Sequence, residues 1–367
     1  MNPVLEKVSE LGDVYEFTLK NINVSLANAI RRTILSEIPT VSFYTELVAG
    51  NQCNIEINTT RLHNEILKHR LSCIPVHEKD PDLLVGKYIL ELDVANDTDS
   101  MMMVTTEHFK IRNKANNNYL TKDETRRIFP SNQMTQHYID FVRLRPKISD
   151  SIPGEHIKLT CEFSVHTAKE NSVYNVVSKC SYANSKDVAK AVEVWESYER
   201  KLASEDTPRE DIEFQKKNFD LLDAQRYYKE DSFDFVVQTV GVYSNKEIVK
   251  KACSIIYDKL SQMILDIDSD SVPINHSETT MEFCYDIVLK DEDYTLGKIL
   301  EYVIYEKYYK EENILTFCGF KKYHPHNSES IIRIAYSNNL DKRMVAQYLR
   351  IACATAVDVF KNVYKMF

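Results

Sequence analysis

The chain has 367 residues, 43% of them apolar and 28% charged, which is the composition of an ordinary globular protein with room for two or three domains. Its net charge is −9, so it lacks the basic surplus with which proteins bind nucleic acid on their own. No stretch is apolar enough for a membrane helix and the start has no signal-peptide pattern, so we expect an intracellular location.

The cysteines and glycines argue against two further classes of site. The eight cysteines stand at 53, 73, 161, 180, 253, 284, 318 and 353, too dispersed for the short ligand pairs of a zinc site. We expect most or all of them to be small buried thiols in a reducing compartment. The seven glycines form neither G-x-G-x-x-G nor G-x-x-x-x-G-K-[ST], so no phosphate-binding loop is predicted.

The chain opens with a predicted strand and helix. Residues 14–20 alternate apolar and polar, and apolar residues from Ser25 to about Ile38 recur at helical spacing. Pro39 ends this helix, because proline disfavours helix at the residue before it. Arg31 and Arg32 project in neighbouring directions, where they suit the carboxylates of a partner or plain solvation.

Residues 48–176 predict a β-rich segment, because several short alternating stretches are separated by loops rich in Asn and Asp. One helix is expected at about 61–70. Its final pair, His69 and Arg70, suits either the helix dipole or contact with a partner.

Residues 185–230 are strongly charged and periodic, and they predict an exposed helical arm or a solvated helix pair without a partner. A strand at 232–239 follows. A capping box at 244–247 then starts a helix with one apolar side, reaching about Met263. Residues 266–280 are polar and acidic and indicate a linker.

Asp266, Asp268 and Asp270 form a D-x-D-x-D run within that linker. A calcium loop is disfavoured, because Ser271 and Ser277 stand where a turn glycine and a bidentate glutamate belong. The competing hypothesis is a free-standing, metal-dependent nucleotidyltransferase or nuclease that uses these carboxylates. We favour linker carboxylates, because no catalytic motif surrounds them.

The C-terminal part predicts a strand at 282–289, a helix from Thr295 to about Tyr308, strands at 315–320 and 331–336, and a long amphipathic helix to the end. His324 and Pro325 lie in the sequence His-Pro-His. A turn is the favoured interpretation, because two histidines without a third ligand make a weak metal site.

Two stretches that lie 270 positions apart are similar to each other. Residues 15–21 (YEFTLKN) match 285–291 (YDIVLKD) without a gap, and 25–30 (SLANAI) align with 295–300 (TLGKIL). Each copy is a strand, a polar turn and a helix that begins after Ser or Thr. The economical hypothesis is a dimer fused into one chain, and chance similarity between two strand–helix units is the alternative.

Two motifs of the first half resemble signatures of the RNA polymerase alpha-like subunits. Residues 23–40 (NVSLANAIRRTILSEIPT) resemble their assembly motif, and residues 58–75 (NTTRLHNEILKHRLSCIP) resemble their next signature. Residues 291–300 (DEDYTLGKIL) and 317–326 (FCGFKKYHPH) are similar to the small alpha-like partner, the archaeal L subunit or the eleventh subunit of RNA polymerase II. Their fusion in one chain is similar to an arrangement in some large DNA viruses.

The sequence departs from this family in two places. The cysteines do not reproduce the four-cysteine metal loop of many relatives, so we predict no metal and no cofactor. Residues 168–174 (AKENSVY) lack the histidine of a family stretch, which puts any contact made by that histidine in doubt. The charged arm has no clear counterpart.

The resemblance implies an α+β fold with two alpha-like dimerisation modules in an intramolecular pseudo-dimer. The first, third-subunit-like module is expected at 1–47 and 177–265, interrupted by a β-rich insertion at 48–176. A linker at 266–280 and a small eleventh-subunit-like module at 281–367 follow.

The resemblance also implies a non-catalytic subunit of DNA-directed RNA polymerase. Its implied partners are the two largest subunits and other small ones, with DNA and RNA touched only indirectly and no membrane contact. Its location would be a viral factory or virion in the cytoplasm if the protein is viral, and the nucleus otherwise. The implied interface residues are Asn28, Arg31, Arg32, Glu37, Pro39, Glu65, His69, Arg70, Thr295, Leu296, Gly297, His324 and Pro325.

Overall fold

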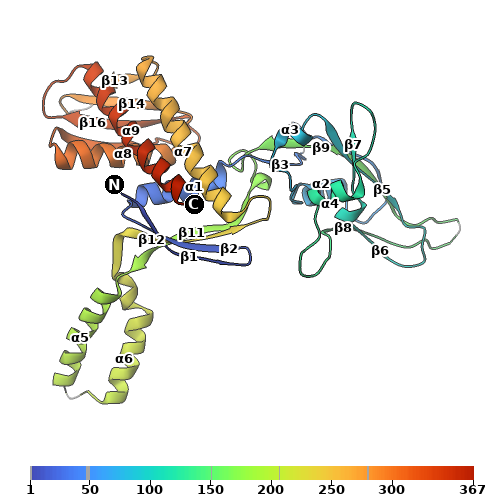
Figure 1. Ribbon diagram of the computed structural model, residues 1–367, viewed down its shortest axis with the longest axis horizontal. Helices are drawn as coiled ribbons and strands as arrows, with labels where there is room; N and C mark the ends of the chain where they lie inside the picture. Colours follow the sequence, from blue (N-terminus) through green and yellow to red (C-terminus); the bar gives the residue numbers. More distant parts are fainter. Residues whose placement is uncertain (1, 47–49, 150, 206, 279–280) are drawn as a thin grey trace. The chain divides into compact units, whose positions relative to one another are not determined.

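The computed structural model describes residues 2–46, 50–149, 151–205, 207–278 and 281–367 (Figure 1). Contacts divide the chain into two compact units. Unit 1 comprises Met1–Ile34, Lys179–Gln238 and Asn245–Phe367, and unit 2 comprises Leu35–Ser178 and Thr239–Ser244. Helices and antiparallel sheets occur in both, which confirms the predicted α+β class. Within the described residues, no helix has the length and apolar character that crossing a membrane requires.

The first sheet of unit 1 combines strands that are distant in the sequence. Its order is β1-β2-β12-β11, with β1 at Val4–Leu11, β2 at Val14–Lys20, β12 at Tyr228–Thr239 and β11 at Val177–Lys186. The alternation in β2 buries Tyr15, Phe17 and Leu19. Helix α1, at Val24–Ser36, buries an apolar stripe that includes Leu26 and Ile30. The predicted strand and helix are confirmed.

The second sheet of unit 1 has the order β13-β14-β16-β15. Its strands are β13 at Ile274–His276, β14 at Cys284–Lys290, β16 at Glu329–Tyr336 and β15 at Leu315–Lys321. Helix α8, at Tyr294–Ile304, follows β14 and continues into a π-helical segment, Tyr305–Glu311. The two sheets therefore have equivalent orders. The second strand of each leads into a shorter helix, β2 into α1 and β14 into α8. The third strand of each precedes a long helix, β12 before α7 and β16 before α9.

The two strand–turn–helix connections also agree in detail. The residue directly after each strand has a left-handed backbone conformation, with φ of 57° at Asn21 and 56° at Asp291. The side chain two residues after this left-handed residue caps the start of each helix. The Oδ1 atom of Asn23 accepts from the Ser25 amide at 2.8 Å, and the Oδ1 atom of Asp293 accepts from the Thr295 amide, also at 2.8 Å.

The long helices α7, at Asn245–Asp268, and α9, at Lys342–Met366, pack against each other (Figure 1). They run antiparallel, because the start of α7 lies beside the end of α9 and the end of α7 lies beside the start of α9. Lys250 lies over the ring of Tyr364 near one end, and Arg350 bonds Asp268 at 2.9 Å toward the other. The predicted apolar stripe of α9 is buried from Val345 to Val363.

The range expected as a linker, 266–280, contains two regular segments. Helix α7 extends to Asp268, and β13 pairs with β14 through Ile274. Three residues with one buried side chain carry too little pattern to be recognised as a strand in a sequence. The last two residues of this range, 279 and 280, lie outside the described residues, as does the expected module boundary at 47–48.

The charged segment forms a pair of helices, α5 at Val188–Ser204 and α6 at Arg209–Leu221, followed by a 3₁₀ turn at Asp223–Arg226 (Figure 1). The helices pack on a small core of Trp195, Leu202 and Phe219. Most of their other side chains are exposed, which confirms the predicted exposed helices and leaves open whether they contact a partner.

Unit 2 is built on a four-stranded antiparallel sheet of order β4-β9-β5-β7. These strands are β4 at Cys53–Asn58, β9 at His156–Glu162, β5 at Tyr88–Ala95 and β7 at Lys110–Asn113. Two ribbons pair β6 (Met102–Thr105) with β8 (Asp140–Leu144) and β3 (Thr40–Ser42) with β10 (Ser164–His166). The helices of unit 2 are α2 (Asn64–Ser72), α3 (Pro81–Leu84), α4 (Lys122–Ile128) and 3₁₀ turns at Thr106–His108 and Ser172–Tyr174.

Candidate functional site

Helix α1 carries three of the predicted interface residues in unit 1. Asn28 and Arg31 pair within the helix, with the Arg31 Nε atom donating to the Asn28 Oδ1 atom at 3.0 Å. Arg31 also lies beside β11. Burial raises the pKa of the Cys180 thiol to about 12, and the charge of Arg31 opposes that rise. Both Arg31 and Arg32 are half-buried rather than freely solvated.

Arg32 reaches the N-terminus of α8. Its Nη2 atom donates to the Asp293 Oδ2 atom at 2.9 Å, and its Nε atom donates to the Thr295 Oγ1 atom, also at 2.9 Å. Asp293 therefore uses one carboxylate oxygen to cap α8 and the other to hold the guanidinium. Two predicted residues, Arg32 and Thr295, are thus brought together across 263 positions of sequence.

Glu37 and Pro39 follow the end of α1 and belong to unit 2. Pro39 is exposed, and its carbonyl accepts from the Tyr243 hydroxyl at 3.2 Å. Glu37 is half-buried, while Ile38 between them is only 2% exposed. The helix ends at Ser36, as the proline predicts.

Helix α2 displays part of the second motif. Glu65 and His69 are exposed on it. Arg70 is used inside unit 2, because its Nε atom donates to the Phe141 carbonyl at 2.7 Å and its Nη2 atom to the Asp140 carbonyl at 3.0 Å. This guanidinium ties α2 to the start of β8.

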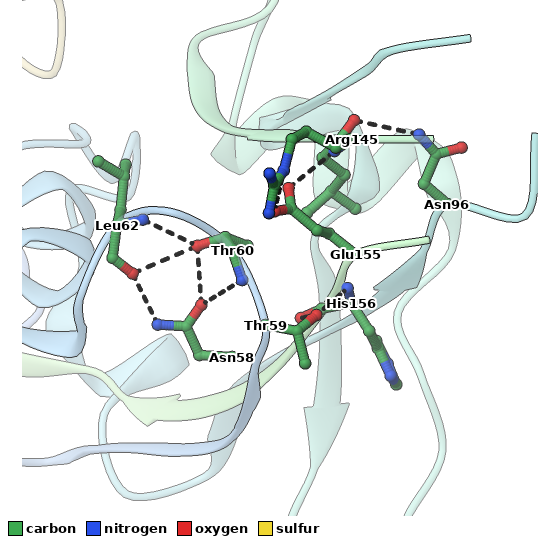
Figure 2. A network of polar contacts seen from close by, with 9 residues as sticks. Asn58, Thr59, Thr60, Leu62, Asn96, Arg145, Glu155 and His156 are labelled. Carbon is green, nitrogen blue, oxygen red and sulfur yellow. Dashed lines mark hydrogen bonds and ion pairs between the residues drawn. The ribbon is translucent and has the colours of Figure 1, made fainter. Parts of the chain in front are cut away.

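The loop that leads from β4 into α2 is fixed by polar contacts (Figure 2). The Oδ1 atom of Asn58 accepts from the Thr60 hydroxyl at 2.7 Å, and its Nδ2 atom donates to the Leu62 carbonyl at 2.7 Å. The Thr59 hydroxyl accepts from the His156 amide on β9, again at 2.7 Å. The asparagine and threonines of this motif therefore fix the loop that leads into α2.

A second layer of the same network lies beside His156 (Figure 2). Glu155, only 7% exposed, accepts from the Arg145 amide at 2.8 Å and forms an ion pair with its guanidinium. Asn96 is fully buried and donates to the Leu144 carbonyl at 3.1 Å. A Cβ atom at Gly154 would lie 1.8 Å from the Asn96 carbonyl oxygen, so the close approach requires glycine.

The remaining predicted residues lie in the second half of unit 1. Thr295, Leu296 and Gly297 are buried at the start of α8. A Cβ atom at Gly297 would lie 2.0 Å from the Phe320 ring, so glycine lets α8 approach β15. His324 and Pro325 are exposed in the turn between β15 and β16, where the His324 Nδ1 atom accepts from the His326 amide at 3.2 Å.

Comparison with known proteins identifies the architecture. The family model of the RNA polymerase Rpb3/Rpb11 dimerisation domain matches residues 16–260, well over half of the chain. The chain belongs to this family. The match covers α1, unit 2 and α7 as far as Leu260, and it stops before β13 and the second sheet.

Several proteins similar to this chain are polymerase subunits. Subunit 3 of DNA-directed RNA polymerases II, IV and V from Arabidopsis thaliana is 24% identical over 72% of this chain and 91% of its own length. Subunit RPB3 of RNA polymerase II from Schizosaccharomyces pombe is 25% identical over 73% and 88%. A Tetrahymena thermophila protein named a conjugation stage-specific protein is 23% identical over 70% and 92%.

The aspartate run has structural partners in this family member. Asp268 is paired with Arg350 at 2.9 Å and Asp270 with Lys342 at 3.2 Å, so both carboxylates fasten the end of α7 to α9. The backbone carbonyl of Asp266 accepts from the Ser271 hydroxyl at 2.8 Å. Across the described part of the chain, no group of three His, Cys, Asp or Glu side chains is arranged to hold a metal ion.

Two residues that join the halves of unit 1 were not among the predicted interface residues. Asp293 is the partner of Arg32, and Glu292 forms an ion pair with Lys259 of α7 at 3.1 Å. Both lie in the motif at 291–300, whose three acidic residues in sequence are a visible signal. Their partners lie in other elements, so local pattern does not reveal the pairing.

Proposed function

We propose that this chain is a non-catalytic assembly subunit of a DNA-directed RNA polymerase that contains both alpha-like partners in one polypeptide. The observation that carries the proposal is the repeated architecture of unit 1. The two sheets have equivalent strand orders, and the third strand of each is followed by a long helix. These two helices, α7 and α9, pack antiparallel. The matching turn and cap at Asn21–Asn23 and Asp291–Asp293 support an internal duplication.

In this proposal the first module corresponds to 1–47 and 177–265, the β-rich insertion to 48–176, and the small module to 281–367 together with β13, which pairs with β14. Joining two partners in one chain makes their association intramolecular and raises its effective concentration. Arg32, Lys259 and the helix pair α7–α9 form the internal interface. The chain then presents a finished heterodimer to the two largest subunits and to other small subunits.

Two exposed residues on α2, Glu65 and His69, are our best candidates for contact with a large subunit. The acidic net charge of −9 disfavours direct binding to nucleic acid, so DNA and RNA would be touched only within the complex. The similarity to fused viral subunits favours a viral enzyme in a cytoplasmic factory or virion, and a cellular enzyme would place the chain in the nucleus.

Affinity capture of the tagged chain from its native setting tests this function. We expect two very large chains to co-purify and the eluate to synthesise RNA from a DNA template. The double variant Glu65→Ala/His69→Ala should reduce recovery of the large chains. Arg209→Ala/Glu213→Ala, which removes an exposed ion pair of the arm, is the matched control and should leave recovery unchanged. A chain that purifies alone would contradict the proposal.

A separate experiment tests the internal heterodimer. A protease site inserted between Ser271 and Val272 would allow the two halves to be separated after folding. We expect the fragments to elute together after cleavage, because α7–α9 packing and the Arg32–Asp293 pair hold them without the covalent link. Two fragments that separate while each stays folded would refute the internal heterodimer and leave polymerase binding to be judged by capture.

A further inference from the structure

Two cysteines face each other at the edge of the four-stranded sheet of unit 2. Cys53 on the edge strand β4 is directly opposite Cys161 on β9. Both are free thiols, and they are 2% and 0% exposed. The proposed assembly function makes no use of them.

The hydrogen bonds around Cys53 show which kind of cross-strand pair this is. Opposite residues in antiparallel strands alternate between hydrogen-bonded pairs and closer, non-hydrogen-bonded pairs. The Glu162 amide donates to the Gln52 carbonyl at 3.2 Å, so the adjacent pair, Gln52 and Glu162, is the hydrogen-bonded one. Cys53 turns its own backbone away from β9: its amide donates to the Asn51 Oδ1 atom at 3.1 Å, and its carbonyl accepts from the Asn51 Nδ2 atom at 3.0 Å.

Cys53 and Cys161 therefore occupy a non-hydrogen-bonded pair, in which Cα atoms are about 4.5 Å apart. That separation lies within the range bridged by protein disulfides, about 4.4–6.8 Å. The Cys161 thiol donates to the Glu162 carbonyl at 3.6 Å. The proximity of the two thiols holds the pKa of Cys53 below its usual value and raises the pKa of Cys161. Cys53 lies on the outer strand of the sheet and its pKa is the lowered one, so we assign it the first attack.

We propose that Cys53 and Cys161 form a reversible disulfide that fastens edge strand β4 to β9 under oxidising conditions. The oxidant is a small-molecule disulfide such as oxidised glutathione. The Cys53 thiolate attacks one sulfur, forms a mixed disulfide and releases one glutathione thiolate. The released glutathione thiolate takes the proton of the Cys161 thiol, and the resulting Cys161 thiolate attacks the Cys53 sulfur. This forms the protein disulfide and releases the second glutathione as a thiolate, so two protein thiols are oxidised and one glutathione disulfide is reduced.

The bond would act on the part of unit 2 that places the candidate interface. Strand β4 leads directly into the loop held by Asn58 and then into α2, which carries Glu65 and His69. A link between residues 53 and 161 closes a loop of more than a hundred residues and so constrains the unfolded chain strongly. We expect the oxidised protein to have a Tm higher by about 5–10 °C.

The test uses the full chain in native buffer, incubated with about 1 mM oxidised or reduced glutathione. Free thiols are then trapped with a maleimide under denaturing conditions and the protein is digested with trypsin. We expect the oxidised sample to contain peptides 33–61 and 159–169 joined, with the loss of two hydrogen atoms, and the reduced sample to contain both peptides alkylated. The wild-type measurement needs no variant to fold.

Two variants sharpen the test. Cys53→Ser should abolish the joined peptides and the rise in Tm. Cys73→Ser, which removes an exposed thiol that could exchange disulfides, should leave both unchanged. The proposal is overturned if both peptides remain alkylated in the oxidised sample, if glutathione stays attached to Cys53, or if the link forms only after urea is added.

Discussion

The contact between Arg32 and the start of α8 gives the sharpest prediction for stability. Replacing Arg32 with alanine removes two hydrogen bonds of 2.9 Å, one to Asp293 and one to Thr295. Charge-assisted hydrogen bonds are worth about 1.5–3 kcal/mol when well buried. The side chains of Arg32 and Asp293 are 33% and 24% exposed, so solvent screening lowers the expected pairwise coupling to about 1 kcal/mol.

A double-mutant cycle isolates that coupling. Arg32→Ala should lower the free energy of unfolding by about 1–1.5 kcal/mol. Asp293→Ala should cost about 2 kcal/mol, because it also removes the side-chain cap of α8. The double variant should cost about 1 kcal/mol less than the sum of the two singles. Urea unfolding followed by circular dichroism measures all three values.

The matched control is Arg31→Ala combined with Asp293→Ala. Arg31 bonds Asn28 within α1, so its effect should add to that of Asp293 within about 0.3–0.5 kcal/mol. Arg32→Lys keeps the charge but cannot reproduce both guanidinium bonds, and it should fall between wild type and alanine. A coupling between Arg32 and Asp293 no larger than that of the control would refute this account of the interface.

Three further changes test other parts of the fold. Gly297→Ala should lower the free energy of unfolding by about 1–3 kcal/mol in urea titrations, because its Cβ atom would meet the Phe320 ring, whereas Lys298→Ala beside it should be nearly neutral. Asn58→Ala should speed hydrogen exchange in the loop before α2, measured by mass spectrometry, and the exposed Asn54→Ala should not. Burial lowers the pKa of His77, so the unfolded chain binds the proton more readily and stability should fall as pH drops below the unfolded pKa of about 6.5. His77→Gln should flatten that pH dependence in thermal unfolding, and an unchanged slope would exclude His77 as its source.

Local patterns predicted most of the regular elements because each depends on residues close in sequence. Alternation in β2, the proline after α1 and the long apolar stripe of α9 all lead to the structure observed. Strand β1 was not predicted. Lys7 has φ of 49° and the register shifts between Glu6 and Ser9, so this strand breaks the two-residue period that reveals a strand in a sequence.

The candidate site shows where sequence reasoning stops. The motifs identified Arg32 and Thr295 separately, but the bond between them depends on how α1 and α8 pack. Arg70 was expected either at the helix dipole or at a partner, and the structure gives it two backbone carbonyls of unit 2. A long side chain on a helix can reach several acceptors, and only the tertiary fold decides which of them it meets.

The Arg32 contact also bears on why two different modules would pair rather than two copies of the first. In a symmetric dimer each contact occurs twice. In the alignment offset by 270 positions, Arg32 of the first module corresponds to Tyr302 of the small module, and Asp293 corresponds to Asn23. A second copy of the first module would offer Arg32 the neutral amide of Asn23 in place of the Asp293 carboxylate. The ion pair therefore favours pairing of the first module with the small module over pairing of two first modules. Asn23→Asp gives the first module a carboxylate of its own, so it should reduce the difference in binding free energy between these two pairings.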